Sequence, residues 1–452
     1  MPSIADELAV AIAHYRAGRL DDATDLYRGI LAREPGNADI HNSLGIVLAV
    51  GRRLPEALAA FNQALALDPN HGMARNNLGN VHRELGDLAA SAACYRETLQ
   101  RNPDHALAHS NLGMVLHEEG RLEDAIVHFE RAISLQPEYA EARLNLSLVR
   151  LLLGDFARGW REFEWRWRVP GFEPAARGFA QPRWQGGKLG GARILLHAEQ
   201  GVGDTLQFLR YVPLVAARGG RVVLRVQPEL ARLLAGLEGA ETVLRTGDPL
   251  PEFACHCPLL SLPSVFQTDL PSIPQGIPYV RPDPQDAARW RTTLGNMAGL
   301  RVGLVWSGRP EHRWDRHRSL PMEFLEPLAR VRGASFVSLQ KGPAAADTAS
   351  ALHGMGIRDI GGQLRDFADT AAAIDPLNLV ITVDTAIAHL AGAMGKKVWV
   401  LLAKVPDWRW LLDRADSRWY PSARLFRQPA AGDWHSVIDE VKIALKYHLA
   451  NG

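Results

Sequence analysis

The sequence predicts an α-helical repeat solenoid followed by an α/β region of two domains with parallel sheets. Three observations support this fold class: a proline recurs every 34 residues near the N-terminus, short apolar strands alternate with helices from Arg193 onward, and a proline-rich stretch at residues 271–284 divides that alternation. The 452 residues, 47% hydrophobic and 22% charged, suffice for roughly three domains of about 150 residues each. This composition excludes disordered, collagen-like and coiled-coil proteins.

Charge and cysteine usage narrow the class of protein further. With 51 Lys and Arg against 50 Asp and Glu, the formal net charge is +1, and no basic stripe stands out, so no nucleic-acid partner is expected. Three cysteines are too few for a disulfide-stapled secreted scaffold. Residues 1–7 lack the basic start and apolar core of a signal peptide, and no apolar run approaches the ~18 residues of a transmembrane segment. We therefore expect a cytoplasmic protein without a transmembrane segment.

The N-terminal repeat has the period and pattern of tetratricopeptide (TPR) repeats. Each 34-residue segment is typical of helix-turn-helix and closes on a proline, which ends the second helix. These prolines are Pro35, Pro69, Pro103 and Pro137. A glycine in the first helix would let paired helices approach, and an aromatic residue in the second is expected to fill the space between neighbouring pairs. The glycines are Gly45, Gly79 and Gly113, and the aromatics are Tyr27, Phe61, Tyr95 and Phe129. An altered fifth unit begins near Ala140, so the repeat domain is predicted over residues 1–169.

An asparagine recurs at one position of three successive units, at Asn77, Asn111 and Asn145. A TPR array holds partner polypeptides in a groove, and an amide both donates and accepts hydrogen bonds, so this row could bind the backbone of an acceptor peptide. The row resembles the asparagine ladder of the O-GlcNAc transferases, whose TPR superhelix guides protein acceptors. The alternative is that these asparagines satisfy contacts between helices. The sequence leaves both interpretations open.

Two segments connect the repeats to the rest of the chain. Trp160, Trp165 and Trp167 alternate with charged residues and are expected to pack the last repeat against the next domain. Residues 170–191 are rich in proline and glycine and are predicted to form a linker.

The remainder has the alternation of an α/β protein with parallel sheets. Strands are predicted at residues 194–196 and 221–226, and onward to about Cys257, with helices over 204–217 and from Pro228. Beyond the proline-rich stretch, strands are predicted at residues 302–306, 335–339, 379–383 and 398–402. Two such domains, at residues 192–282 and 283–452, imply a cleft faced by the carboxyl ends of the strands.

Two motifs argue against common alternatives. Cys255-His256-Cys257 fits a buried strand better than a metal site, because no second ligand pair follows at a suitable distance. The turn Gly201-Val202-Gly203 lacks the third glycine of a dinucleotide fingerprint, since Leu206 occupies that position, and no acid ends the next strand. We therefore do not expect NAD to bind.

Two stretches resemble the signatures of the heptosyltransferase-like glycosyltransferases, family 9. They are Glu199–Phe208, which contains Gly201-Val202-Gly203-Asp204, and Val383–Gly395, which contains Asp384-Thr385-Ala386 and His389. TPR repeats joined to such a unit also resemble bacterial protein glycosyltransferases, flagellin-modifying ones among them. The resemblance implies a GT-B fold of two Rossmann-like domains, with residues 192–282 on the acceptor side and 283–452 on the nucleotide-sugar side. It also implies transfer with inversion from a nucleotide-activated sugar.

Candidate site residues follow from the same two stretches. Glycosyl transfer needs a base for the acceptor and stabilisation of the departing nucleoside diphosphate. Asp204 follows two glycines at the start of a helix and matches the catalytic aspartate of the family, although a helix cap is an alternative role. Asp384 ends a strand, Thr385 opens the next helix, and His389 lies one turn further on. A helix N-terminus of this kind suits a diphosphate, and the matching residues of the family contact the donor.

Cations and polar groups are expected at the same edge of the second sheet. Ser307, Gly308 and Arg309 follow the strand at Trp306, and Arg313, Arg316 and Arg318 come next. Arg318 lies where the family usually has a basic residue near the donor phosphates, and Lys341 ends the following strand. We predict that Ser307, Gly308, Arg309, Arg318 and Lys341 help to bind the donor. No Asp-x-Asp pair occurs, so neither a metal nor another cofactor is expected.

The sequence thus predicts a metal-independent inverting glycosyltransferase that uses its TPR groove to recruit a protein or peptide acceptor, with a flagellin-like protein as one candidate. Two alternatives remain open. One is heptosyltransferase-type transfer to a lipopolysaccharide precursor, and the other is a non-catalytic TPR adaptor built on a degenerate transferase fold.

Overall fold

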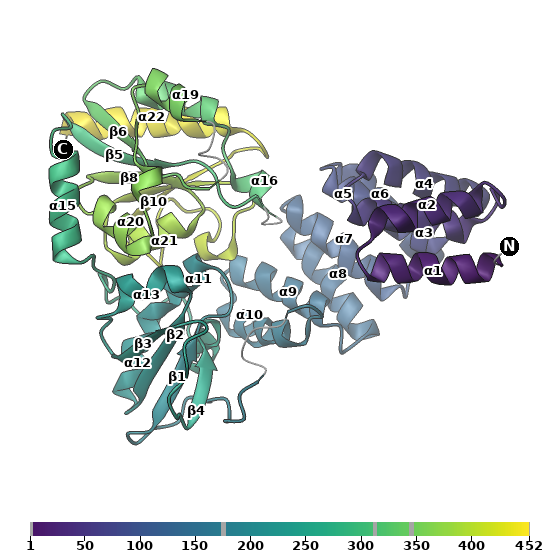
Figure 1. The fold of residues 1–452 in the computed structure, drawn as a ribbon, viewed down its shortest axis with the longest axis horizontal. Coiled ribbons are helices and arrows are strands. Elements are labelled where there is room, and N and C mark those ends of the chain that lie inside the picture. The colour runs from purple at the N-terminus through teal and green to yellow at the C-terminus, as the bar shows by residue number, and fades with distance from the viewer. Residues whose placement is uncertain (1–2, 173–177, 311–313, 343–347, 452) are drawn as a thin grey trace. The chain divides into compact units, whose positions relative to one another are not determined.

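The computed structural model describes residues 3–172, 178–310, 314–342 and 348–451, which form two compact units, Met1–Val149 and Arg150–Gly452 (Figure 1). The boundary falls inside a helix of the predicted fifth repeat, so the second unit begins with the end of that helix.

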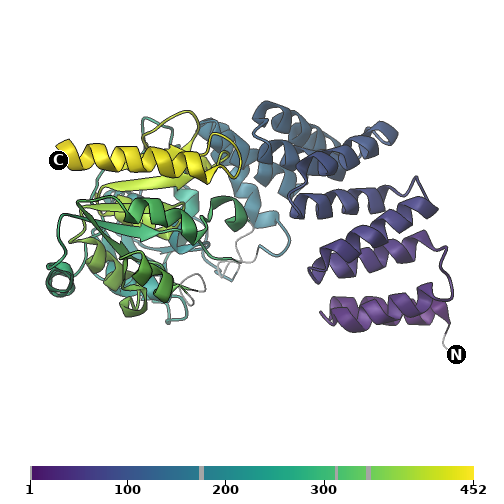
Figure 2. The same cartoon turned by 90° about the horizontal axis from the view of Figure 1, so that it is seen from above.

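The first unit is a solenoid of paired antiparallel helices, which lie side by side in Figure 2. The pairs are α1 (Ile4–Arg16) with α2 (Leu20–Leu31), α3 (Ala38–Val50) with α4 (Leu54–Leu67), α5 (Gly72–Glu84) with α6 (Leu88–Arg101), and α7 (Ala106–Glu118) with α8 (Leu122–Leu135). Helix α9 (Ala140–Leu152) opens the next pair and crosses the unit boundary. The predicted TPR solenoid is confirmed.

Each repeating proline has a second role that its spacing did not indicate. The side chain six residues after the proline donates a hydrogen bond to the proline carbonyl oxygen. The four pairs are His41 to Pro35 at 3.0 Å, Arg75 to Pro69 at 2.6 Å, His109 to Pro103 at 3.0 Å and Arg143 to Pro137 at 2.9 Å. The proline therefore separates two repeats, and its carbonyl also anchors the first helix of the next one.

The recurring glycine and aromatic meet within one helix pair. A Cβ atom on Gly45 would lie 2.6 Å from the ring of Phe61, and one on Gly79 would lie 2.7 Å from the ring of Tyr95. Gly113 and Phe129 repeat this contact at 2.9 Å. We expected the aromatic ring to fill the space between neighbouring helix pairs. In the structure the ring occupies the volume left by the glycine of its own pair.

The second unit contains two parallel sheets, which confirms the predicted α/β region; the GT-B arrangement stays a prediction. The four-stranded sheet has the order β3-β2-β1-β4, with β1 (Arg193–His197), β2 (Arg221–Val226), β3 (Ala240–Arg245) and β4 (Cys255–Pro258). The six-stranded sheet has the order β10-β9-β8-β5-β6-β7, with β5 (Leu300–Val305), β6 (Ala334–Ser338), β7 (Arg358–Asp359), β8 (Leu379–Val383), β9 (Val398–Leu402) and β10 (Ala423–Arg427).

Helices cover both sheets. In the first half they are α11 (Val202–Phe208), α12 (Val212–Ala217), α13 (Pro228–Leu234) and α14 (Leu262–Val265). In the second they are α15 (Pro284–Leu294), α16 (Asp315–Arg318), α17 (Glu326–Ala329), α19 (Ala349–Gly354), α20 (Phe367–Ile374), α21 (Ala386–Ala393) and α22 (Trp434–Asn451). The helix predicted over 204–217 is interrupted by a 3-10 turn at Leu209–Tyr211, because Pro213 has no N–H to donate to the carbonyl of Leu209 four residues earlier.

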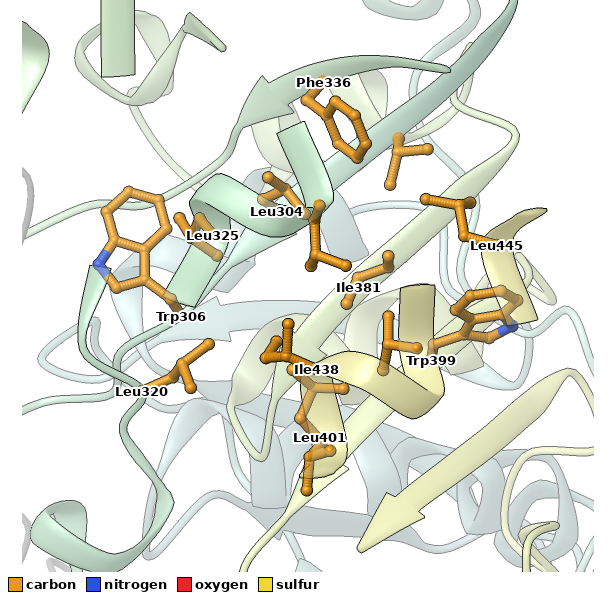
Figure 3. Close-up of a cluster of buried hydrophobic side chains, with 14 of the residues drawn as sticks. Leu304, Trp306, Leu320, Leu325, Phe336, Ile381, Trp399, Leu401, Ile438 and Leu445 are labelled. Atoms are coloured by element: carbon orange, nitrogen blue, oxygen red, sulfur yellow. The ribbon is translucent and has the colours of Figure 1, made fainter. Parts of the chain in front are cut away.

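The larger core lies between the six-stranded sheet and the helices that cover it (Figure 3). Leu304 and Ile381 project from β5 and β8, and Ile438 and Leu445 project from α22 to meet the sheet. All four are at most 2% exposed, so α22 and the sheet share a buried apolar layer.

The segments on either side of residue 170 are built into the second unit. Trp160, on α10 (Phe156–Phe163), crosses the ring of Trp408 edge to face at 5.1 Å and donates to the Thr268 carbonyl at 3.0 Å. Phe156 lies against Trp419 at 6.1 Å. In the predicted linker, backbone hydrogen bonds pair residues 182–184 with His256 of β4, so this part extends the sheet.

Candidate functional site

The candidate site lies where helices α11 and α21 meet. Each follows a parallel strand, β1 and β8 respectively, and so begins at the carboxyl end of its sheet. A Cβ atom on Gly203 would lie 2.8 Å from Cδ2 of His389 and 3.4 Å from the Cα atom of Ala386. Gly203 therefore provides the space for the two helices to touch. This close approach gives a reason for the glycine, although the turn does not match a dinucleotide-binding fingerprint.

Asp204 lies in the first turn of α11 and is engaged through both carboxylate oxygens. Oδ2 accepts from the backbone N–H of Gly201 at 2.8 Å, and Oδ1 accepts from the guanidinium of Arg409. The predicted capping role is thus present. The carboxylate also contacts a cation from the other half of the unit, and 18% of its side chain stays exposed.

Arg409 is the centre of the charged cluster. It lies in a 3-10 turn, Trp408–Trp410, after β9, and donates to Asp407 at 2.8 Å and to the side-chain oxygen of Gln207 at 2.5 Å. Burial acts to lower the pKa of Arg409, but the carboxylates of Asp407 and Asp204 outweigh it and hold that pKa above its usual value. The guanidinium therefore stays charged inside the fold.

Asp384 and Thr385 occupy the end of β8 and the start of α21, as predicted. The Thr385 hydroxyl accepts from the backbone N–H of Ile387 at 3.3 Å and caps the helix. Burial, with the nearby charge of Asp407, raises the pKa of the Asp384 carboxyl to about 6. Arg318 acts in the opposite sense on that pKa, and its guanidinium donates to the Asp384 carbonyl oxygen at 3.0 Å. Asp384 thus exchanges its proton near neutral pH.

His389 lies one turn into α21, and its side chain is buried. Its Nδ1 lies 3.0 Å from the hydroxyl of Tyr420, and its ring stacks on Trp410 at 5.6 Å. Burial, followed by the charges of Arg409 and Arg210, holds the pKa of His389 well below its usual range, while burial raises the pKa of Tyr420. We assign the phenol as donor to Nδ1, which places the imidazole proton on Nε2.

The loop after β5 is held in a fixed shape by two polar side chains. The amide oxygen of Gln340 accepts from the backbone N–H of both Trp306 and Ser307 at 3.1 Å. The Ser319 hydroxyl accepts from the N–H of Gly308 at 3.0 Å. These bonds bring the loop to the same edge of the sheet as Asp384.

Gly308 is required by its neighbours, because a Cβ atom there would lie 2.3 Å from the carboxylate of Asp315 and 2.6 Å from the guanidinium of Arg318. Arg318 pairs with Asp315 at 3.2 Å and also contacts Asp384, so it belongs to the cluster. Of the predicted donor-binding residues, this cation is therefore the one that the described structure joins to Asp384.

The other cations predicted near the donor have different surroundings from those of Arg318. Arg309 is 80% exposed and lies 4.0 Å from Glu229. Lys341 is exposed, and its ammonium group donates to the backbone carbonyls of Leu364 and Arg365. Arg313 lies outside the described residues.

The asparagine row of the repeats joins neighbouring first helices. The amide nitrogen of Asn77 donates to the side-chain oxygen of Asn42 at 3.0 Å, and that of Asn111 donates to Asn76 at 3.0 Å. Asn145 is half-buried on α9. Each bond uses one donor, whereas an amide has two donors and an acceptor, so a helix contact and a peptide contact are compatible.

Sequence analysis missed the role of Arg409 and of its partners Asp407 and Gln207. In the sequence, the segment Asp407-Trp408-Arg409-Trp410 stands out for its aromatic residues alone. Its place after the strand at residues 398–402 was the available signal, since the carboxyl ends of parallel strands converge on one edge. The partner Asp204 lies 205 residues away in sequence, so the ion pair itself had no sequence signal.

The described residues contain neither a candidate metal-ion site nor a candidate membrane-spanning helix. No three His, Cys, Asp or Glu side chains there are grouped so that they could hold a metal ion. Over the same residues, no helix combines the length and the apolar character needed to span a membrane.

Comparisons with known proteins match the repeats to a family model and find a relative whose similarity extends beyond them. A tetratricopeptide repeat family model matches residues 8–71, 76–135 and 120–159. Protein FlbA of Caulobacter vibrioides is 29% identical over 334 residues, a match that covers 67% of this chain and 54% of that protein. Because 67% of the chain is longer than the repeat unit, this similarity includes part of the α/β unit. This chain therefore matches only about half the length of that relative.

Solved structures are similar to this chain at low identity and low TM-score. MamA from Desulfovibrio magneticus RS-1 is 21% identical with a TM-score of 0.33, and the match covers 36% of this chain and 91% of that one. Pseudomonas aeruginosa pilF is 19% identical with a TM-score of 0.35, covering 38% of this chain and 78% of that one.

Proposed function

We propose that the α/β unit is a glycosyltransferase that uses a nucleotide-activated sugar and that the TPR array binds a protein acceptor. The observation that carries this proposal is the meeting of Asp204 with Arg409, together with Asp384, Arg318 and His389, where α11 and α21 touch. Carboxylate and guanidinium groups from two parallel sheets are thereby brought to one edge. Transfer from a diphosphate leaving group needs this pairing of a base with fixed cations.

In this proposal Asp204 takes the proton of the acceptor. A carboxylate has about four lone-pair positions, and the hydrogen bonds from Gly201 and Arg409 use two of them. The contact with Arg409 holds the carboxylate in one orientation until the acceptor arrives. When donor phosphates enter, they compete for the same guanidinium, which would free a lone pair on Asp204.

The departing diphosphate would be stabilised by groups of the second half. Arg318 supplies a fixed positive charge beside the N-terminus of α21, whose backbone N–H groups favour anions. Asp384 is compatible with an anion because its raised pKa, about 6, lets it take up a proton as negative charge accumulates nearby.

Two measurements test this function. We expect isothermal titration calorimetry with a panel of nucleoside diphosphates to detect binding by the full chain, and Arg318→Met to weaken it at least tenfold. Arg330→Met is the matched control, because the Arg330 side chain is 77% exposed and its ion pair is with Glu326, four residues earlier on the surface. Asp204→Asn should keep donor binding and lower single-turnover transfer by ~10²–10⁴-fold.

The outcomes separate the competing functions. Undiminished transfer by Asp204→Asn would reject its role as base. Failure of the wild type to bind any nucleotide or nucleotide sugar would reject the transferase and favour the adaptor. Transfer to a lipopolysaccharide precursor with no transfer to any protein would favour the lipid-acceptor alternative.

A further inference from the structure

One row of residues crosses the first helices of the repeat unit and is apolar in the middle and acidic at its ends. It consists of the second residue of α3, α5, α7 and α9, namely Asp39, Met73, Leu107 and Glu141, each 34 residues from the next. Met73 is 64% exposed and Leu107 is 43% exposed. The side chain of Asp39 is 92% exposed. The row therefore presents two apolar side chains, with an acid at each end.

A second row runs beside it, one helical turn further along each helix. Positions four residues apart lie on the same face of a helix, so Asn77 follows Met73 on α5 and Asn111 follows Leu107 on α7. The hydrogen bonds from Asn77 to Asn42 and from Asn111 to Asn76 tie neighbouring first helices together. The apolar pair and the asparagines thus form one continuous surface, which we call the A-helix surface.

The charge of the whole repeat unit favours a cationic partner. Residues 1–149 contain 13 arginines and no lysine against 20 aspartates and glutamates, a formal net charge of −7. The chain as a whole carries +1, so the acidic character belongs to the repeats alone. A field of this sign attracts basic segments and repels acidic ones.

The spacing of the helices sets the spacing of a bound peptide. Packed helices lie ~8–10 Å apart, and an extended chain advances ~3.3 Å per residue, so neighbouring helices meet side chains about three residues apart. We propose that the A-helix surface binds an extended peptide that carries two apolar residues three positions apart. One lysine or arginine lies three positions before the first apolar residue, and another lies three positions after the second. This pattern is the same in both directions, so either orientation of the peptide satisfies it.

Each part of the surface has a separate role. The apolar side chains of the peptide would cover Met73 and Leu107, and the flexible thioether of Met73 adapts to differently shaped partners. The asparagine amides would bond the peptide backbone between these anchors. The basic residues would pair with Asp39 and Glu141 at the ends. The inference rests on the proposed function only in taking this peptide to be part of the acceptor.

Peptide binding to the full chain tests this specificity by fluorescence anisotropy. The probe is a labelled twelve-residue peptide of serine and glycine, with leucine at its fifth and eighth positions and lysine at its second and eleventh. We expect binding by the wild type, and at least tenfold weaker binding when serine replaces both leucines or glutamate replaces both lysines. Raising the salt should weaken the contribution of the lysines and spare that of the leucines.

Variants of the chain provide the matched test. Met73→Ser combined with Leu107→Ser should weaken the probe at least tenfold, whereas Val127→Ser, at a 63% exposed apolar position on the second helix α8, should leave it unchanged. Asp39→Lys combined with Glu141→Lys should transfer the preference to the glutamate-flanked peptide. Because the substituted positions are partly or largely exposed, melting curves should show that every variant is folded.

Three results would overturn the inference: equal affinity of the wild type for all the peptides, equal losses from Val127→Ser and the Met73 and Leu107 pair, or an unchanged preference after charge reversal. None of these measurements involves a sugar. Peptide specificity without any transfer would reject the proposed function alone, and transfer without this specificity would reject the inference alone.

Discussion

Replacing Asp384 by asparagine is expected to stabilise the protein at alkaline pH. Burial and the charge of Asp407 raise the pKa of the Asp384 carboxyl from 3.8 to about 6 in the folded state. Ionising this group therefore costs more in the folded chain than in the unfolded one. Asparagine has nearly the same shape and no charge, so Asp384→Asn removes that cost.

The pH range and the magnitude follow from linkage. Between about pH 4 and pH 6 the folded state holds a proton that the unfolded state has released, so the free energy of unfolding of the wild type falls across this range and stays lower above it. A shift of about two pKa units at 1.36 kcal/mol per unit amounts to roughly 3 kcal/mol. Asp384→Asn should thus match the wild type near pH 4 and exceed it by up to about 3 kcal/mol at pH 8.

Urea unfolding at pH 4.5 and pH 8 measures this difference. Asp269→Asn is a control of opposite sign, because hydrogen bonds from Ser272 hold the pKa of Asp269 below its usual value, and the substitution should cost stability at pH 8. An Asp384→Asn variant that is less stable than the wild type at pH 8, or equally stable at both pH values, would refute the reasoning.

Two further substitutions test other contacts of the same unit. Gly203→Ala puts a methyl group 2.8 Å from the His389 ring and should cost ~1–3 kcal/mol in urea unfolding, whereas Gly354→Ala, with no atom within 4 Å, should be neutral or stabilising; equal effects would contradict this packing. Arg166→Met leaves the buried carboxyl of Glu199 without its cation and should cost ~3–5 kcal/mol at pH 8. The loss of stability should be smaller at pH 6, because burial raises the pKa of Glu199 to about 7 and removing Arg166 would raise that pKa further. Equal losses at the two pH values would contradict this role of Arg166.

The sequence predicted those helices and strands that have a repeat period or an apolar run within their own residues. The 34-residue period located every helix pair of the repeat unit, and β2, β8 and β9 coincide with the predicted apolar runs. Strand β10 has arginine at two of its five positions and lies at an edge of its sheet, and β7 has only two residues, so neither resembles a buried run.

Contacts between distant segments were beyond the sequence patterns. Asp204, Asp384 and His389 were found because they lie in the two stretches that resemble family signatures, each close to the start of a predicted helix. Arg409 contacts Asp204 only after two sheets have come together, and Gly203 is required only because a buried ring lies against it. Local spacing contains no information on either contact. The position of the candidate site could therefore be predicted from the sequence, but the contacts between its side chains could not.

The packing of α10 determines where this chain could be divided without damage. Phe156 and Trp160 fill an aromatic cluster that the loops around Trp408 and Trp419 would otherwise expose. A fragment beginning at residue 170 would lack both rings and present that apolar surface to water, which favours aggregation. A fragment beginning near residue 150 would keep them. Repeats could therefore be gained, lost or exchanged upstream of α10, while α10 itself would have to be inherited with the sheets.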